Sequence, residues 1–135
     1  MRKGGRAVRK EAELWAKDAL YDFECAKDML RNKKYNYAVF FARQSVEKML
    51  KACYVQILAK PFPKEHNLLT LATAVFGRGG REISDEIVFL NPHYTITRYV
   101  DSALDIPAKL YTESFAKEGI KKAEKVIAWL KNKIK

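Results

Sequence analysis

The sequence has 135 residues, of which 48% are hydrophobic and 12% are aromatic. This length and composition fit one domain with a single hydrophobic core, and they exclude an intrinsically disordered chain. No apolar run reaches the roughly 18 residues of a membrane span, and no apolar segment follows the basic start as in a secretory signal. We therefore expect a cytoplasmic protein with no membrane-spanning segment.

The net charge of +10 comes from the two ends of the chain. Residues 1–10 hold five basic residues and no acidic one, and residues 117–135 hold seven lysines against two glutamates. Between these segments, 14 basic and 14 acidic residues cancel. We interpret residues 1–10 as a basic N-terminal arm and residues 11–135 as a single helical domain. The excess charge is either a solvated surface or an electrostatic collar for phosphate backbones.

The cysteines and histidines are too few and too scattered for a metal site. Cys25 and Cys53 fall within helical patterns and lack C-x-x-C spacing, so we expect buried thiols rather than a disulfide. His66 and His93 are the only histidines, and no zinc-ligand pattern can be assembled. Neither a metal nor a cofactor is predicted.

The spacing of apolar residues predicts three helices in the first half of the chain. In residues 11 to about 32, apolar side chains recur at steps of three and four. A second helix spans about residues 37–59, and the prolines of "KPFPKEHN" end it. A third, shorter helix follows Asn67, which is suited to be its N-cap.

Shorter elements follow before a long last helix. "GRGGR" is predicted to be a flexible turn, because a phosphate-cradling loop would also need Gly-Lys-Ser/Thr. "EISDEIVFL" is predicted to be a short helix, "NPHYTI" a loop, and "TRYVDSAL" one or two helical turns. The last helix spans about residues 112–133. Because strand-like alternation is missing, we predict an all-α fold, an up-and-down bundle of about five helices.

Charged residues gather on one arc of the second helix. At about 100° per residue, its apolar residues cover half the circumference and the polar ones share the opposite arc. This polar stripe consists of Arg43, Gln44, Glu47, Lys48 and Lys51. Its two i,i+4 ion pairs, each worth about 0.2–0.5 kcal/mol, suit a solvated outer face. The wide apolar arc instead favours a helix that is central in its bundle or at an oligomer interface, with the stripe bordering a groove.

Four segments of the sequence carry a resemblance to a known family. After a Trp-containing first helix they are, in order, "YAVFFARQSVEKMLKA", "HNLLTL", "TRYVD" and "YTESFAKEGIKKAEKVIAWL". Over about residues 11–133 this set resembles the HEPN domain, the nucleotide-binding domain of higher eukaryotes and prokaryotes. Within the family it looks most like small stand-alone prokaryotic proteins that are often encoded beside a minimal nucleotidyltransferase. The resemblance implies a homodimer with a role around nucleotides or RNA.

The resemblance does not extend to the catalytic motif of the family. Many members are metal-independent ribonucleases that carry an Arg, four to six residues, and then a His. The positions at that spacing after Arg98 are Ala103, Leu104 and Asp105, and no arginine stands at the corresponding positions before either histidine. We therefore assign no catalytic residue.

Six residues are candidates for binding a nucleotide or RNA: Arg43, Lys48, Lys51, His66, Arg98 and Tyr99. Arg98 could bind a phosphate while Tyr99 stacks on a base, or Arg98 could pair with Asp101 or Asp105. His66 either caps the third helix or contacts the ligand.

We predict a binding module that acts as a homodimer with a partner nucleotidyltransferase, in a toxin–antitoxin-like or substrate-presenting role. One alternative is a divergent ribonuclease toxin that uses Arg98 and His66 without the usual spacing. The other is a dimer that serves protein interaction alone.

Overall fold

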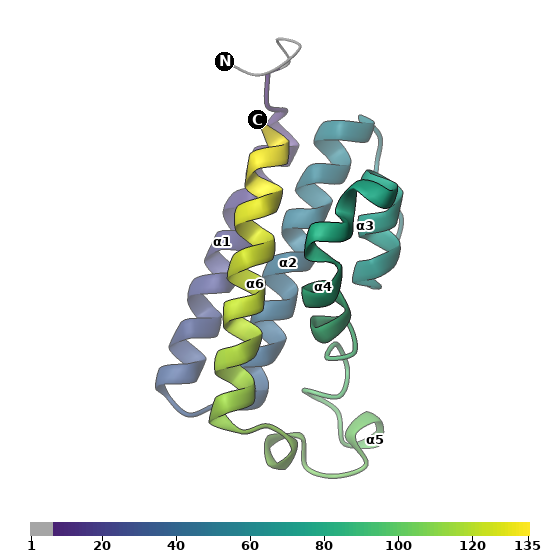
Figure 1. Cartoon of the computed structure of the whole chain (residues 1–135). Helices are drawn as coiled ribbons and strands as arrows, with labels where there is room; N and C mark the ends of the chain where they lie inside the picture. The colour runs from purple at the N-terminus through teal and green to yellow at the C-terminus, as the bar shows by residue number, and fades with distance from the viewer. Residues whose placement is uncertain (1–6) are drawn as a thin grey trace.

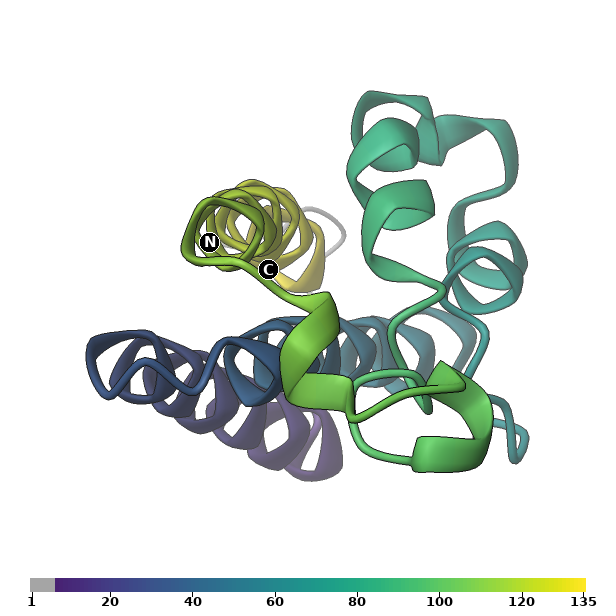
Figure 2. The same ribbon diagram turned by 90° about the horizontal axis from the view of Figure 1, so that it is seen from below.

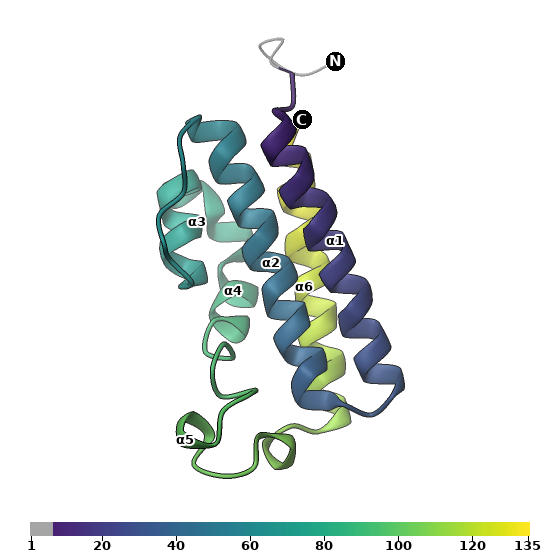
Figure 3. The ribbon, with the colours of Figure 1, turned by 180° about the vertical axis from the view of Figure 1, so that it is seen from behind.

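Three long helices form the body of the bundle. The computed structural model describes residues 7–135. Within that range the long helices are α1 (Lys10–Arg31), α2 (Tyr35–Leu58) and α6 (Glu113–Ile134). α1 runs antiparallel to both α2 and α6 (Figure 1). Seen from behind, α1 and α2 lie in front of α6 (Figure 3).

A group of short helices packs beside the three long helices, where a four-helix bundle would have its fourth helix. These are α3 (Leu68–Phe76), the 3₁₀ helix η2 (Gly77–Ile83) and α4 (Ser84–Leu90), which stand apart from α1 beyond α2 (Figures 1 and 2). Single turns, α5 (Val100–Ala103) and η3 (Pro107–Leu110), then lead to α6. Every regular element of residues 7–135 is helical, so the predicted all-α fold is confirmed.

The hydrophobic core is built around α2, which packs against α1, α3 and α6. Val46, Met49, Leu50 and Cys53 are fully buried there. Burying an aliphatic side chain of this size contributes roughly 1.5–3 kcal/mol, so this row of residues supplies much of the stability. The wide apolar arc predicted for the second helix therefore reflects a central position in the bundle.

The ends of the short helices follow local sequence signals. The side chain of Asn67 accepts a hydrogen bond from the backbone N–H of Thr70 at 3.0 Å, which confirms the predicted N-cap. α3 ends at Gly77, whose φ of +55° suits a residue without a Cβ. The prediction of a flexible turn at "GRGGR" is wrong, because η2 continues the chain as a 3₁₀ helix.

The chain is anchored where it enters α1. The buried side chain of Gln56 accepts a hydrogen bond from the backbone N–H of Arg9 at 2.8 Å and donates one to the carbonyl of Ala7 at 3.0 Å. The start of α1 is therefore fixed to the end of α2. Residues 1–6 of the predicted basic arm lie outside the described part of the chain.

Two further expectations can be compared with residues 7–135. None of the helices in this range has the length and apolar character needed to cross a bilayer. Both cysteines are free thiols, but only Cys53 is buried; Cys25 is partly exposed, so its predicted burial is wrong.

Candidate functional site

A buried carboxylate, that of Glu47, lies at the centre of the polar stripe on α2. Glu47 is only 2% exposed. Its Oε1 accepts a hydrogen bond from Nη1 of Arg43 at 2.8 Å. Its Oε2 lies 3.1 Å from Nζ of Lys51 and 2.9 Å from Nδ1 of His66. Three basic side chains therefore surround one carboxylate.

The predictions for this stripe, a solvated face or the border of a groove, are both wrong for its central residues. Arg43, Glu47 and Lys51 are buried. The cause is tertiary: the segment of residues 59–67 and the turn of residues 91–99 fold over this side of α2. Helical periodicity places a side chain on an arc but does not show what covers that arc.

Arg43 ties both covering segments to α2. Its Nε donates a hydrogen bond to the carbonyl of Asn91 at 3.1 Å, and its Nη2 donates to the carbonyl of His66. The Asn91 side chain in turn accepts from the backbone N–H of Leu68 at 2.8 Å and donates to the side chain of Asn67 at 3.2 Å. Asn91 was not among the predicted site residues, because it lies in a segment predicted only as a loop.

The ionisation of Glu47 is set by its three neighbours. Burial raises the pKa of this carboxyl, but hydrogen bonds from His66, Arg43 and Lys51 outweigh burial and leave its pKa below the ordinary value of 4.5. The stabilisation that Glu47 provides is therefore present above about pH 4.5 and is lost as the pH falls through the lower folded-state pKa.

The two lysines of the stripe point to different partners. Lys51 has its Nζ 4.8 Å from the ring centroid of Phe62, which comes from the covering segment. Lys48 pairs instead with Asp18 and Asp22, at 2.8 Å each, and so joins α2 to α1. Lys48 is thus neutralised within the bundle, and Lys51 belongs to the buried network around Glu47.

Tyr94, in the turn after α4, brings two further candidates together. Its ring stacks on that of His66, with centroids 4.5 Å apart and an angle of 18° between the planes. Cζ of Arg98 lies 4.8 Å from the same ring centroid, and Cζ of Arg43 lies 4.9 Å from it. His66 and Arg98, which are far apart in the sequence, therefore converge on one aromatic ring. Tyr94 was not among the predicted site residues.

Arg98 is held by aromatic rings and backbone rather than by a carboxylate. Its Cζ lies 4.2 Å from the ring centroid of Phe40 and 4.7 Å from that of Tyr99. Its Nε and Nη2 donate to the carbonyl of Tyr94 at 3.0 and 2.8 Å. Within residues 7–135 no acidic side chain forms an ion pair with Arg98, so the alternative pairing with an aspartate is wrong. Its positive charge is not neutralised.

His66 presents half of its side chain to solvent, with 52% exposed. Among the described hydrogen bonds of its ring, only Nδ1 is engaged, by Glu47. Because Asn67 caps α3, the cap interpretation of His66 is wrong. Tyr99 is also half exposed. The open part of the site is therefore formed by His66, Arg98 and Tyr99, above the buried network. We refer to these three residues together with Tyr94 as the aromatic site.

His93 is partly buried and is not part of the aromatic site. Its Nδ1 lies 2.7 Å from the hydroxyl of Tyr111, and its ring packs edge-on against Phe115. Burial and the charge of Arg43 lower the pKa of His93 below its ordinary value, so this ring is neutral near pH 7.

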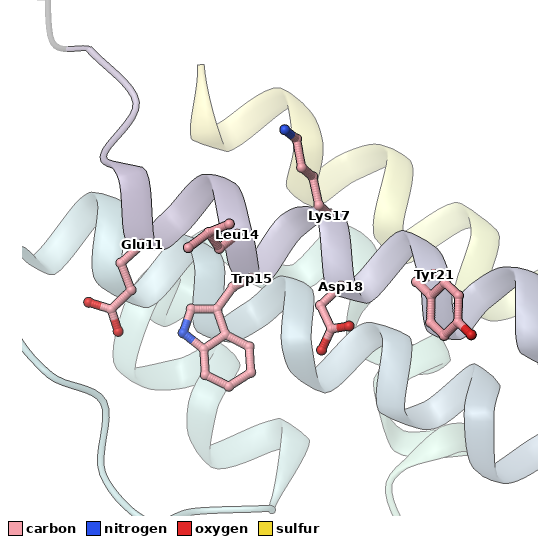
Figure 4. A pocket seen from close by; sticks show the side chains of 6 residues that line it. All are labelled: Glu11, Leu14, Trp15, Lys17, Asp18 and Tyr21. Carbon is pink, nitrogen blue, oxygen red and sulfur yellow. The ribbon is translucent and has the colours of Figure 1, made fainter.

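A hollow of about 640 Å³ lies elsewhere, along the outer side of α1 (Figure 4). Its lining side chains are Glu11, Leu14, Trp15, Lys17, Asp18 and Tyr21. All six come from one helix, so the hollow is a surface depression rather than an enclosed site. None of the six predicted binding residues lines it. In the part of the chain described, no group of three or more His, Cys, Asp or Glu side chains could hold a metal ion.

The buried network makes a testable prediction about stability. We expect Glu47→Gln to lower the free energy of unfolding by about 3–5 kcal/mol, because it leaves the buried Arg43 and Lys51 without their counter-charge. Urea denaturation at pH 7, followed by circular dichroism, measures this loss. Glu113→Gln is the matched control, since it removes a carboxylate from the exposed i,i+4 pair with Lys117 at the start of α6 and should lower the free energy of unfolding much less than Glu47→Gln does. Equal effects of the two substitutions would contradict the role given to Glu47.

The HEPN domain family matches residues 12–133. Two similar solved structures are TT1696 from Thermus thermophilus and ST0689, described as an archaeal HEPN homologue. The first is 26% identical with a TM-score of 0.81, covering 93% of this chain and 99% of that one. The second is 30% identical with a TM-score of 0.75, covering 94% of this chain and 100% of that one. No curated protein sequence matches.

The family match spans nearly all of the helices, and the two structures share their arrangement. The predicted resemblance is therefore confirmed, and the chain belongs to the HEPN domain family.

Proposed function

We propose that this HEPN protein is a binding module for a nucleotide or RNA, and that the aromatic site is where the ligand binds. The observation that carries the proposal is the convergence of His66 and Arg98 on the ring of Tyr94, at 4.5 Å between ring centroids and 4.8 Å from Cζ to centroid. The family to which the chain belongs supports the same class of ligand.

The chemistry of Arg98 suits a phosphate. A guanidinium carries five N–H donors. Two nitrogens of Arg98 donate to the carbonyl of Tyr94, and Nη1 lies 3.3 Å from the hydroxyl of Tyr99. Donors therefore remain available, and the charge is not neutralised by a carboxylate among the described residues. A charge-assisted hydrogen bond to a phosphate oxygen is about twice as strong as a neutral one.

Tyr99 and His66 supply the rest of the contact in this proposal. The half-exposed ring of Tyr99 offers a face on which a base can stack, a contact worth about 1–3 kcal/mol. The ring of His66 is fixed through Nδ1 by Glu47, which leaves its other nitrogen for the ligand. Arg43 and Lys51 do not contact the ligand in this proposal; from the buried network they hold Glu47 and the covering segments in place. Lys48, paired with α1, contributes least.

A thermal-shift experiment tests this site. At a ligand concentration about 100 times Kd, binding stabilises the folded state by about 2.7 kcal/mol, which is a shift of several degrees for a chain of this length. We expect a shift with a nucleoside triphosphate or with oligouridine at low salt, and we expect Arg98→Ala to abolish the shift caused by the nucleoside triphosphate. Arg78→Ala, which removes an exposed arginine from η2, is the matched control and should keep the shift. Unchanged melting with every ligand would refute the proposal.

A second candidate function, ribonuclease activity, is favoured by one observation. The contact between Glu47 and Nδ1 of His66 at 2.9 Å resembles the carboxylate–histidine pairs that orient a general base or acid. Arg98 would supply the cation that stabilises the charge on the phosphorus in the transition state. The proton-transfer group and the cation are thus both next to Tyr94, although the family's sequence spacing is absent.

Incubation of the protein with labelled RNA in EDTA separates the two functions. The ribonuclease function predicts cleavage that His66→Ala lowers at least 100-fold while RNA binding is largely retained. His93→Ala is unsuitable as a control because the partly buried His93 contacts the buried Tyr111, so Lys64→Ala, which removes an exposed charge from the same segment as His66, serves instead. RNA that stays intact under these conditions would leave binding as the only activity of the site.

We further propose that the protein is a homodimer that associates through α5 and η3. Next to Tyr99, four large apolar side chains are exposed in this short stretch: Val100, Leu104, Ile106 and Leu110. Leu104 is 88% exposed and has a φ of +57°, a conformation that costs a leucine free energy. A second copy would cover this apolar surface beside the aromatic site. A nucleotidyltransferase partner, which the family resemblance implies, would then act on or beside the bound nucleotide.

Sedimentation equilibrium tests the interface. We expect a dimer that Leu104→Glu converts to a monomer, because the substitution buries a charge at the interface. Leu14→Glu is the matched control, since it places the same charge at an exposed leucine of α1. If Leu14→Glu dissociates the dimer and Leu104→Glu does not, the interface lies on α1 instead. A chain that is monomeric at all concentrations would refute the homodimer.

A further inference from the structure

The solvent side of α6 carries a row of lysines. At about 100° per residue, five lysines fall within roughly 120° of the helix circumference. All five are exposed: Lys117, Lys121, Lys125, Lys131 and Lys135, the last directly after the helix. We call this surface the lysine face. At about 1.5 Å per residue it extends roughly 27 Å along the bundle.

Carboxylates neutralise only part of the lysine face. Lys117 pairs with Glu113, and Lys125 pairs with Glu86, each at 2.9 Å. Glu124 also lies on this arc, but it forms none of the described ion pairs. Among the residues described, no carboxylate side chain pairs with the other three lysines. A net positive charge therefore faces solvent, unlike the charges of the buried network on α2.

Two basic residues of the described chain, Arg9 and Lys10, lie where α1 begins, at one end of α6. The start of α1 and the end of α6 lie at the same end of the bundle (Figures 1 and 3). The exposed residue Arg9 is held at this end through its backbone by Gln56. Arg9 thus adds its charge to that of the last lysines of α6 at the same end of the bundle, whereas Lys10 pairs with Glu13 at 3.3 Å.

We infer that the lysine face binds the phosphodiester backbone of a single-stranded nucleic acid. Backbone binding requires cations spaced along a groove or ridge and no apolar contact. Protein interfaces and amphipathic membrane helices, in contrast, rely on large apolar side chains. Of the large apolar side chains that are exposed among the described residues, none belongs to α6. The positive charge of the lysine face and its lack of large exposed apolar side chains therefore favour a polyanion as its ligand.

This surface is separate from the aromatic site. None of the four residues of the aromatic site comes from α6, and none of the five lysines touches them in the contacts described. A mononucleotide can occupy the aromatic site alone, whereas a strand of several nucleotides is needed to follow the lysine face. The two ligand contacts can therefore be separated by experiment.

Fluorescence anisotropy with labelled 20-mer oligouridine measures the backbone contact. We expect the triple variant Lys121→Ala, Lys131→Ala, Lys135→Ala to raise Kd at least 10-fold in low salt. The plot of the logarithm of the association constant against the logarithm of the salt concentration should become less steep by about 2, since each phosphate contact on a single strand contributes about 0.7 to its negative slope. The matched control is Lys27→Ala, Arg78→Ala, Lys109→Ala, which removes the same charge from α1, η2 and η3 and should change Kd less than twofold. A triple Lys→Arg variant of the lysine face should retain binding.

Several results would overturn the inference. An equal loss of affinity in both alanine triples would mean that only net charge matters. Undetectable binding of oligouridine by the wild-type chain would also refute it, as would binding to phosphatidylserine vesicles that the first triple abolishes while oligouridine binding persists. Failure of the aromatic site is recognised separately, because it removes the melting shift caused by a mononucleotide and leaves the difference in oligouridine affinity between the two alanine triples unchanged.

Discussion

The ionised carboxylate of Glu47, held by three basic side chains inside the bundle, is the interaction on which the site depends. Removing a carboxylate from water costs several kcal/mol, and only well-placed partners offset that cost. Two partners come from the same helix at i−4 and i+4, and the third, His66, comes from the covering segment. Arg43 can then turn its remaining donors to the carbonyls of His66 and Asn91. The two segments that carry the aromatic site are attached to α2 by this network.

Tyr94 connects the buried network around Glu47 with the exposed residues of the aromatic site. Its ring contacts His66 and two arginines, so it connects the neutralised interior with the unpaired charge of Arg98. A ring with negative potential on its faces lets cations lie close to it without a carboxylate. Arg98 therefore stays near the other basic groups while keeping donors for a ligand. His66 and Arg98 come close to each other here although the family's Arg-x4-6-His spacing is missing. That spacing describes two residues of one short segment, whereas these two residues come from separate segments that the fold brings together.

The fold could be predicted from the sequence because its signals are local. Apolar periodicity located the long helices, and Asn67 showed where α3 begins. The pairs Arg43–Glu47 and Glu47–Lys51 were also visible, since they are four residues apart on one helix. Their burial was not, because it depends on segments that arrive from residues 59–67 and 91–99. Asn91 and Tyr94 carried no pattern that distinguishes them from other loop residues, so their roles required the tertiary structure.

The position of each charge matters more than the total. The polar stripe on α2 looks basic in the sequence, yet Arg43 and Lys51 share Glu47, and Lys48 is matched by two aspartates. These cations therefore contribute little to the field outside the molecule. Within α6, three lysines have one carboxylate partner each and the other three, Lys121, Lys131 and Lys133, form none of the described ion pairs. The start of α1 lies at the same end of the bundle as the end of α6 (Figure 1). The electrostatic field that a distant polyanion meets comes mainly from these unpaired lysines, whereas Arg98 acts only on a group already within hydrogen-bonding reach. A long anionic ligand would thus be attracted by one surface and recognised at another.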